Sequence, residues 1–311
     1  MMQSKTIGSS SVAAILGLSP WATPMSVWAD ITGLVERDST GNAATRRGQI
    51  MESAIRDEAA RRLGTAIVPG PKYEDDPRVA PAPYEFAHCR EDGLHFDTAT
   101  QLWWVDEVKT VRDFAEWGDD GSAEIPAYYM AQVLWQMIVC SLLGYKIGGC
   151  KVWAFCPMTD DLREYTIEFD AERGMKMLEV VGDWYRAHVV GNVPPPSDGS
   201  EATRKVLARL YPGGIEKVVI DATSADVNDK QIIQEANNEI ATIEIRRDAA
   251  KARLMERIGQ NGATHIRGVC AWSPVKPRTS FDSKAALAAD PSLSRFQTVG
   301  EPSRRFTLTE K

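Results

Sequence analysis

The sequence predicts an α/β fold in which two β-hairpins share one sheet and helices cover it. β-type segments at 93–96 and 102–108 flank a polar Asp/Thr cluster, which indicates an antiparallel hairpin. A second pair of alternating segments, 151–157 and 162–169, is joined by turn residues 159–161 and extends the sheet. Helical periodicity before, between and after these hairpins supplies the covering layers.

The helices are indicated by capping residues and by apolar side chains at helical spacing. They are expected just after the serine cluster at 9–11, from Thr23-Pro24 to near Gly33, from Asn42 to Gly64, from Ile125-Pro126 through Leu143, over 171–190 and, as one long helix or a helical hairpin, over 225–258. Ser10 or Ser11 is a natural N-cap for the first helix. Trp21 and Trp28 are expected to be core residues beside the second.

The composition limits the class of protein. Lys and Arg number 36 against 43 Asp and Glu, so any DNA contact must be a local basic lining of a cleft or channel. The five cysteines are an odd number without a CxxC pair, which argues against a disulfide framework or a structural zinc site. No segment approaches membrane-spanning length and the start is not signal-like. We expect a soluble, cytoplasmic protein with reduced thiols.

The first hairpin brings charged residues to one patch. If it turns at its Thr-Ala-Thr segment, facing residue numbers sum to about 199, so Asp92 lies across from Glu107. Strand side chains repeat every second residue, so Lys109 shares the face of Glu107 and Val108 points the other way. Asp97 would lie roughly 16 Å from Glu107, too far to share an ion.

This patch suits a hard divalent cation such as Mg²⁺. The cation binds few carboxylate oxygens, keeps water ligands and benefits from a nearby ammonium that orients an attacking water. The pattern D-x14-E-x-K, formed by Asp92, Glu107 and Lys109, is nevertheless short enough to arise by chance. A solvated hairpin face with an ion pair is the competing interpretation.

Two further groups of polar residues each allow two interpretations. Glu52, at the edge of an apolar helical stripe, either pairs with Arg56 one turn on or reaches the carboxylate patch. Arg46 and Arg47 precede it and either contact phosphate near the cleft or are ordinary surface residues. The helix start beside Ser10 could be simply capped or could hold a phosphate.

Gln132 and Gln136 lie one turn apart on the buried helix expected over 126–143. Buried amides need hydrogen-bond partners. Bonds to the backbone are one interpretation, and a contact to the candidate lysine, to water or to DNA is the other.

Four strings follow one another along the chain: IGSSSVAAILGLSPWATP, RRGQIMESAIRDEAARRLG, EDGL…EVKT and IPAYYMAQVLWQM. In their order and rough spacing they resemble the motifs of the YqaJ-like phage recombinase exonucleases. These enzymes resemble the lambda-type exonuclease of the PD-(D/E)XK nuclease superfamily. The resemblance covers about residues 7–170, and the rest more loosely. It implies a mixed central sheet flanked by helices, with a restriction-endonuclease-like core.

The resemblance also implies a role for each candidate residue. Asp92, Glu107 and the Val108 carbonyl would bind metal, with Glu52 as a further ligand or water-bridged group; Lys109 would orient the nucleophilic water, supported by Gln132; Ser10 would contact DNA phosphate. The cofactor would be Mg²⁺, with Mn²⁺ able to substitute. Two departures stand out. Glu91 occupies a position where the family usually has Pro, and only Gln3 and Lys5 stand where a Trp…Arg phosphate-binding segment is common.

The sequence predicts three parts: a nuclease core at 1–193, a Pro-rich linker at 194–200, and a C-terminal helical arm with a small β-containing tail at 201–311. The resemblance implies a metal-dependent exonuclease that resects linear double-stranded DNA ends from 5′ to 3′ by two-metal hydrolysis. The product strand would pass to a RecT- or Bet-like single-strand annealing protein. A homo-oligomer, such as a ring-shaped trimer, is also implied, as is the cytoplasm of a bacterial host.

The sequence leaves three alternative functions open. A different PD-(D/E)XK endonuclease or a RecB-like repair nuclease would share the core. A non-catalytic DNA-binding module would retain the fold without its carboxylates, yet all of them are present here. A protein-interaction scaffold would be built on the helix at 225–258.

Overall fold

The computed structural model describes residues 5–35, 43–71, 78–213, 219–277, 279–298 and 306–308 of the 311-residue chain. The chain divides into two compact units, Met1–Tyr211 and Pro212–Lys311. The Pro-rich segment 194–200 falls inside the first unit, because the helix that follows it packs against a neighbour of the core. The three-part division at 194–200 stays a prediction.

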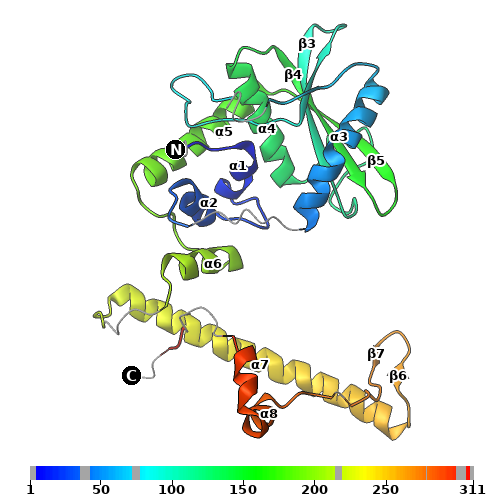
Figure 1. The fold of residues 1–311 in the computed structure, drawn as a ribbon, viewed down its shortest axis with the longest axis vertical. Helices are drawn as coiled ribbons and strands as arrows, with labels where there is room; N and C mark the ends of the chain where they lie inside the picture. Colours follow the sequence, from blue (N-terminus) through cyan, green and yellow to red (C-terminus); the bar gives the residue numbers. More distant parts are fainter. Residues whose placement is uncertain are drawn as a thin grey trace. The chain divides into compact units, whose positions relative to one another are not determined.

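A five-stranded mixed sheet forms the centre of the first unit (Figure 1). Its strands are β1 (Val68–Pro69), β2 (Gly93–Asp97), β3 (Leu102–Thr110), β4 (Ile147–Cys156) and β5 (Asp161–Glu168), in that order across the sheet. All neighbours are antiparallel except β3 and β4, which are parallel. A parallel pair requires a crossover, and helix α4 (Ala127–Leu142) supplies it. The predicted mixed α/β fold with flanking helices is therefore confirmed.

Both predicted hairpins are present. β2 and β3 pair Gly93 with Asp106 and Asp97 with Leu102, so facing residue numbers sum to 199, as the turn position predicts. β4 and β5 form the second hairpin, which ends in the pair Cys156 and Asp161. Local turn chemistry thus sets the register of the strand that carries the candidate site.

Helices cover both faces of this sheet. The helices of this unit are α1 (Ser9–Ile15), α2 (Pro24–Ile31), α3 (Ala43–Leu63), α4, α5 (Ala171–Trp184), its π-helical continuation (Tyr185–Val190) and α6 (Glu201–Leu210), which packs on α2. α1, α4 and α5 share the main apolar core with Val105, Val152 and their neighbours on one face of the sheet. On the opposite face, Ile55 and Ala59 of α3 pack with Trp153. Alternate residues of β3 consequently meet different layers.

The first helix begins earlier than expected. It starts at Ser9, with Gly8 as its N-cap and no side-chain cap, so the prediction that Ser10 or Ser11 caps it is wrong. The backbone at Ile7 forms a bridge with Ala87 and enters the helix directly afterwards. A Cβ at position 8 would lie only 2.8 Å from the His88 ring, so this close approach favours glycine.

The two tryptophans beside the second helix differ in their surroundings. Trp28 is buried and donates a hydrogen bond from Nε1 to the His188 carbonyl at 3.0 Å, as a core residue should. Trp21 is 67% exposed, so its prediction as a core residue is wrong. Its ring contacts Tyr128 edge-on, with centroids 4.9 Å apart, because the segment ahead of the Thr23 cap runs along the surface.

The C-terminal unit contains one long helix, α7 (Ser224–Gln260), which decides between the single helix and the helical hairpin. Thr223 and Asp226 form a capping box at its start. A short hairpin of β6 (His265–Ile266) and β7 (Cys270–Ala271), helix α8 (Ser283–Ala289) and a 3₁₀ turn (Pro291–Phe296) follow. A C-terminal helical arm with a small β-containing tail is therefore confirmed.

Within the described ranges, no helix is both long and apolar enough to cross a bilayer.

Candidate active site

Asp92 lies at the point where the chain enters β2. Its Oδ2 accepts a hydrogen bond from the Val108 amide on β3 at 2.8 Å, and its carbonyl accepts one from Arg56 Nη1 of α3 at 3.0 Å. The next residue must be small, because a Cβ on Gly93 would lie 2.3 Å from the Ile67 side chain. The Asp92 carboxylate is thus fixed against the strand that carries Glu107.

Glu107 is the centre of a polar cluster between β3 and α4. The residue is 2% exposed, and its Oε1 forms an ion pair with Lys109 Nζ, two positions along the same strand. Gln132 Nε2 donates to the same oxygen at 2.5 Å, and its Oε1 accepts from Lys109 Nζ at 3.1 Å. Gln136 Nε2 donates to Glu107 Oε2 at 2.7 Å. Both carboxylate oxygens are therefore held by neighbouring side chains.

The contacts of Gln132 and Gln136 show which of the two kinds of hydrogen-bond partner, backbone or side chain, each amide has. Their spacing of one helical turn puts both amides on the sheet-facing side of α4, where they contact Glu107. Gln136 also donates to the Arg90 carbonyl at 2.8 Å, which ties α4 to the segment just before Asp92. Gln132 makes the contact to the candidate lysine, whereas Gln136 combines a side-chain contact with a backbone contact, and a functional role for Gln132 stays a prediction.

Burial and like charge dominate the electrostatics of this cluster. Desolvation, followed by the Glu107 charge, raises the pKa of Asp92 to about 8, although Lys109 and the Val108 amide oppose the rise. Burial works against the charge on Lys109, but the carboxylates of Glu107 and Asp92 outweigh it and raise the pKa of that ammonium. When both carboxylates are ionised they face one ammonium, which leaves an excess of negative charge.

The residues present fit a hard divalent cation. The donor set offers carboxylate oxygens from Asp92 and Glu107, and a cation would offset the desolvation and the repulsion that together raise the Asp92 pKa. Gln136 Oε1, beside Glu107, is buried and has no hydrogen-bond partner among the residues that the structure describes. The Val108 amide, rather than its carbonyl, makes the observed contact to Asp92, so ligation by the carbonyl stays a prediction.

Glu52 lies on α3 with its side chain 40% exposed. It forms the expected ion pair with Arg56, whose Nη1 lies 3.0 Å from Glu52 Oε1, and the same guanidinium contacts the Asp92 carbonyl. The Glu52 charge also contributes to the raised pKa of Asp92. The two interpretations of Glu52 are therefore compatible, since the ion pair holds this carboxylate near Asp92.

The candidate phosphate-binding residues differ in their distance from this cluster. Arg46 and Arg47 are exposed at the start of α3. The adjacent Gly48 faces Thr110, whose Oγ1 would lie 3.3 Å from an added Cβ, so this end of α3 lies beside the end of β3. On α1, Ser10 is exposed and Ser11 half-buried, and no hydrogen bond described for either one reaches the carboxylates.

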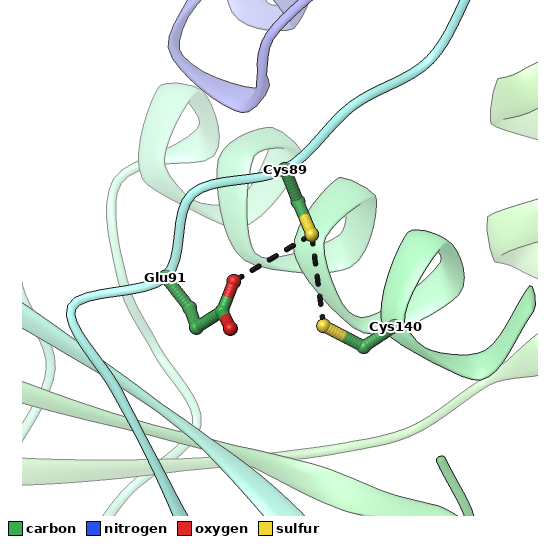
Figure 2. Close-up of side chains that lie close together, drawn as sticks. All are labelled: Cys89, Glu91 and Cys140. Carbon is green, nitrogen blue, oxygen red and sulfur yellow. Dashed lines mark hydrogen bonds between the residues drawn. The ribbon is translucent and has the colours of Figure 1, made fainter. Parts of the chain in front are cut away.

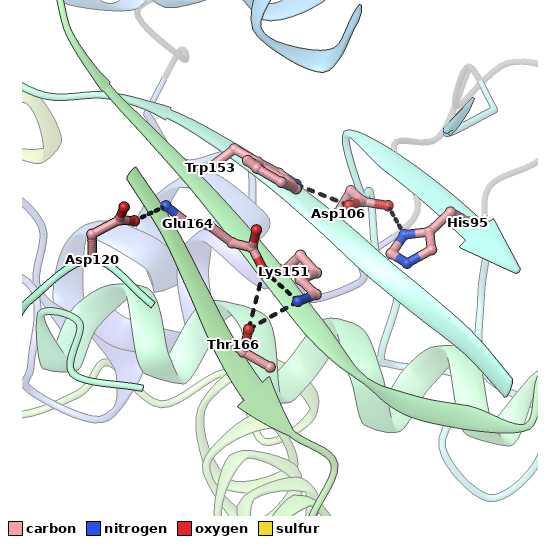
Figure 3. A network of polar contacts seen from close by, with 7 residues as sticks. All are labelled: His95, Asp106, Asp120, Lys151, Trp153, Glu164 and Thr166. Carbon is pink, nitrogen blue, oxygen red and sulfur yellow. Dashed lines mark hydrogen bonds and ion pairs between the residues drawn. The ribbon is translucent and has the colours of Figure 1, made fainter. Parts of the chain in front are cut away.

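The sheet carries a second polar network, which the sequence did not predict (Figure 3). Asp106 is fully buried, and its carboxylate bonds His95 Nδ1 at 2.7 Å and accepts from Trp153 Nε1 at 3.0 Å. Because Asp106 and Glu107 are adjacent on β3, they point to opposite faces of the sheet. Strand parity could have predicted this separation, but the partners of Asp106 come from two other strands.

We expect Gln136→Met to lower the free energy of unfolding by about 1 to 3 kcal/mol, because it removes the donor to the Arg90 carbonyl and to Glu107 Oε2 at nearly constant volume. Urea denaturation of the full chain measures this difference. Gln231→Met is the matched control, since that glutamine is exposed on α7 and donates its hydrogen bond to Glu235, one turn along the same helix. Equal stability of Gln136→Met and the control would contradict the expectation.

Comparisons with known proteins agree with the expected family. Residues 1–143 match the family model for the YqaJ-like viral recombinase domain. The Bacillus subtilis (strain 168) protein named "Uncharacterized protein YqaJ" is 27% identical over 231 residues, covering 71% of this chain. The alignment covers 65% of that relative, so the chain spans just under two thirds of its length.

Solved exonuclease structures are more distant. The alkaline exonuclease LHK-Exo from Laribacter hongkongensis superposes with a TM-score of 0.44 at 17% identity, over 67% of this chain and 95% of that one. A phage-related exonuclease from Haemophilus somnus 129PT gives 0.41 at 12% identity, over 60% and 96%. Scores this low provide no residue-by-residue correspondence. The family match concerns the N-terminal part: residues 1–143 of this chain are similar to the YqaJ-like viral recombinase domain.

Proposed function

We propose that this protein is a metal-dependent deoxyribonuclease that degrades linear double-stranded DNA from its ends. The observation that carries the proposal is the convergence of Asp92, Glu107 and Lys109 on one side of the β2–β3 hairpin, held by glutamines of α4. The YqaJ-like domain over 1–143 supports it. Phosphodiester hydrolysis is the chemistry that paired carboxylates and an ammonium serve best.

Asp92 and Glu107 would hold the metal, with Glu52 and the Val108 carbonyl as further candidates. Mg²⁺, for which Mn²⁺ can substitute, supplies Lewis-acid polarisation of the phosphate and a lower pKa for the attacking water when a pair of ions is bound. The protein fixes the carboxylates in advance through the Val108 amide and the α4 glutamines. Reorganisation during the reaction is then small.

Lys109 would orient the attacking water and stabilise the negative charge that develops on the phosphate. Its ammonium is kept in place by Glu107 and by Gln132 Oε1, and lies 4.9 Å from the centre of the Tyr129 ring. These contacts restrict a flexible side chain to one position. Gln132 therefore acts as a positioning residue for Lys109.

Arg46, Arg47, Ser10 and Ser11 are our candidates for contacts to the DNA backbone. The two arginines are exposed at the end of α3 that lies beside β3, where a strand leaving the carboxylates would pass. Local contacts of this kind suit a chain with more acidic than basic residues. The cleavage direction from 5′ to 3′ and the cytoplasmic location are part of the same proposal.

A protein partner is favoured by the surface of α7. Ile240, Ile243 and Ile245 of this helix are each more than half exposed. Exposed aliphatic residues of this kind often mark contacts with other proteins. We propose that the unit carrying α7 binds either a RecT- or Bet-like annealing protein or further copies of the chain in a ring such as a trimer. The scaffold interpretation predicts that deleting 225–258 abolishes the biological role of the protein and leaves hydrolysis intact.

The test uses linear duplex DNA labelled separately at its 5′ and 3′ ends, with closed circular duplex beside it. Under Mg²⁺ we expect release of labelled mononucleotide from linear DNA, none from circular DNA, and none in EDTA. Cleavage of the closed circular duplex would show that the protein is an endonuclease rather than an exonuclease. Intact linear DNA under Mg²⁺ and under Mn²⁺ would refute the catalytic proposal.

A further inference from the structure

Three buried side chains outside the nuclease site point toward one another between α4 and the segment that leads into β2 (Figure 2). Cys89 Sγ lies 3.7 Å from Cys140 Sγ and 3.6 Å from Glu91 Oε2. One ligand atom from each residue lies within 4.8 Å of the other two. Both thiols are fully buried, and Glu91 is 5% exposed.

These separations match the edges of a metal coordination polyhedron. Zinc ligands at about 2.3 Å for sulfur and about 2.1 Å for oxygen, arranged tetrahedrally, place two sulfurs about 3.8 Å apart and a sulfur and an oxygen about 3.6 Å apart. The observed distances of 3.7 Å and 3.6 Å agree with both values. A cation could enter between the three atoms with little movement of the backbone.

The charge at this position also balances. Arg78 Nη2 forms an ion pair with Glu91 Oε1 at 2.8 Å, and its guanidinium lies 5.1 Å from the centre of the Tyr145 ring. Glu91 therefore contacts Arg78 with one oxygen and turns the other toward the Cys89 thiol. Two thiolates and a carboxylate carry three negative charges, which a divalent cation and the Arg78 guanidinium neutralise.

We propose that Cys89, Cys140 and Glu91 bind one thiophilic divalent cation of the Zn²⁺ class, at a site separate from the proposed Mg²⁺ site. Binding displaces the two thiol protons and leaves one coordination position for water. Thiolate ligands select Zn²⁺ over Mg²⁺, so the two sites take different ions. Sequence spacing hides this site, because its cysteines are 51 residues apart and meet only in the fold.

The cation would act as a clamp on the nuclease site. Cys89 and Glu91 lie just ahead of Asp92, and Cys140 lies one turn beyond Gln136 on α4. Gln136 already joins the same two segments through the Arg90 carbonyl. Metal binding would add a second connection there and restrict the position of the Asp92 backbone. The site is thus structural, and its ligands are positioning residues.

The test titrates the full chain, freed of metal by a chelator, with Zn²⁺ or with Co²⁺ alone. We expect about one equivalent of bound Zn²⁺ by elemental analysis, a thiolate-to-cobalt charge-transfer band, and a higher midpoint of thermal unfolding with Zn²⁺. Cys140→Ala and the conservative Cys140→Ser should both lose the band. Cys150→Ala is the matched control, because that thiol is equally buried but lies outside the cluster.

Two results would overturn the proposal. One is a wild-type chain without a cobalt–thiolate band or bound Zn²⁺, which would make the cluster ordinary core packing of two thiols. The other is a Cys140→Ser protein that folds, by circular dichroism, and still binds as the wild type does. Glu107→Gln should keep Zn²⁺ binding, so failure of the nuclease proposal and failure of this one are distinguishable.

Discussion

Glu107→Gln and Lys109→Met are each expected to reduce the rate of DNA hydrolysis by a factor of at least about 10³, because each removes a charge on which metal binding or transition-state stabilisation depends. Gln keeps the shape of Glu107 and Met keeps most of the length of Lys109. The proteins should therefore remain folded. Release of mononucleotides from end-labelled linear duplex under Mg²⁺ measures the rate, and circular dichroism checks the fold.

The chain offers a matched control for these two variants. Lys151 of β4 and Glu164 of β5 form another half-buried ion pair on the same sheet, in which Lys151 also bonds Thr166 (Figure 3). Lys151→Met and Glu164→Gln remove the same charges away from Asp92. Hydrolysis by these proteins should stay near the wild-type rate. If all four variants lost activity equally, the loss would reflect the sheet as a whole rather than the proposed site.

Asp92→Asn is expected to abolish metal-dependent hydrolysis and at the same time to stabilise the metal-free protein, by an amount that grows above about pH 4 and is complete near pH 8. The folded-state pKa of Asp92 is raised to about 8, chiefly by desolvation and then by Glu107, from its ordinary value of 3.8. Between these values the folded protein binds more protons than the unfolded chain, so the free energy of unfolding falls as pH rises. Asn carries no charge, so the Asp92→Asn protein lacks this pH dependence of the free energy of unfolding.

The free energy of unfolding of Asp92→Asn should exceed that of the wild type by on the order of 1 to 3 kcal/mol near pH 8. Thermal or urea unfolding in EDTA across pH 4 to 9 measures it, and the two proteins should converge near pH 4. Mg²⁺ should stabilise the wild type more as pH rises toward 8, because protons then compete less for Asp92. The expectation would be contradicted if the free energy of unfolding of the wild type fell with pH no more steeply than that of Asp92→Asn.

Asp97→Asn is the control for this experiment. The Asp97 carboxylate bonds Thr100 Oγ1 and the Ala99 amide in the hairpin turn, and these hydrogen bonds lower its pKa. Its stabilising effect is present at neutral pH and is lost as pH falls through the lowered pKa, the opposite sign to Asp92. Hydrolysis should be unaffected, since Asp97 pairs with Leu102 at the far end of the hairpin.

Local chemistry made much of the fold and part of the site predictable. The turn that includes Asp97 fixes the register that places Asp92 across from the strand of Glu107, and strand parity places Lys109 beside Glu107. Thr23 and Thr223 mark two helix starts by capping, which depends on residues within one turn. Such features lie a few residues apart in the chain, so periodicity and turn preferences are enough to find them.

Only the tertiary structure could decide which partners meet across long separations. It directs Gln132 and Gln136 to Glu107, leaves Trp21 exposed on Tyr128, and buries Asp106 between His95 and Trp153.

The start of the first helix and the thiol cluster also depend on contacts between residues far apart in the chain. The helix begins at Ser9 because Ile7 bridges to Ala87, and Cys89 meets Cys140 because α4 crosses the sheet beside the entry to β2. Sequence patterns record the intrinsic preference of each segment and the face that it buries. The identity of the neighbour on that face depends on packing between segments distant in the chain, and packing carries no local signature.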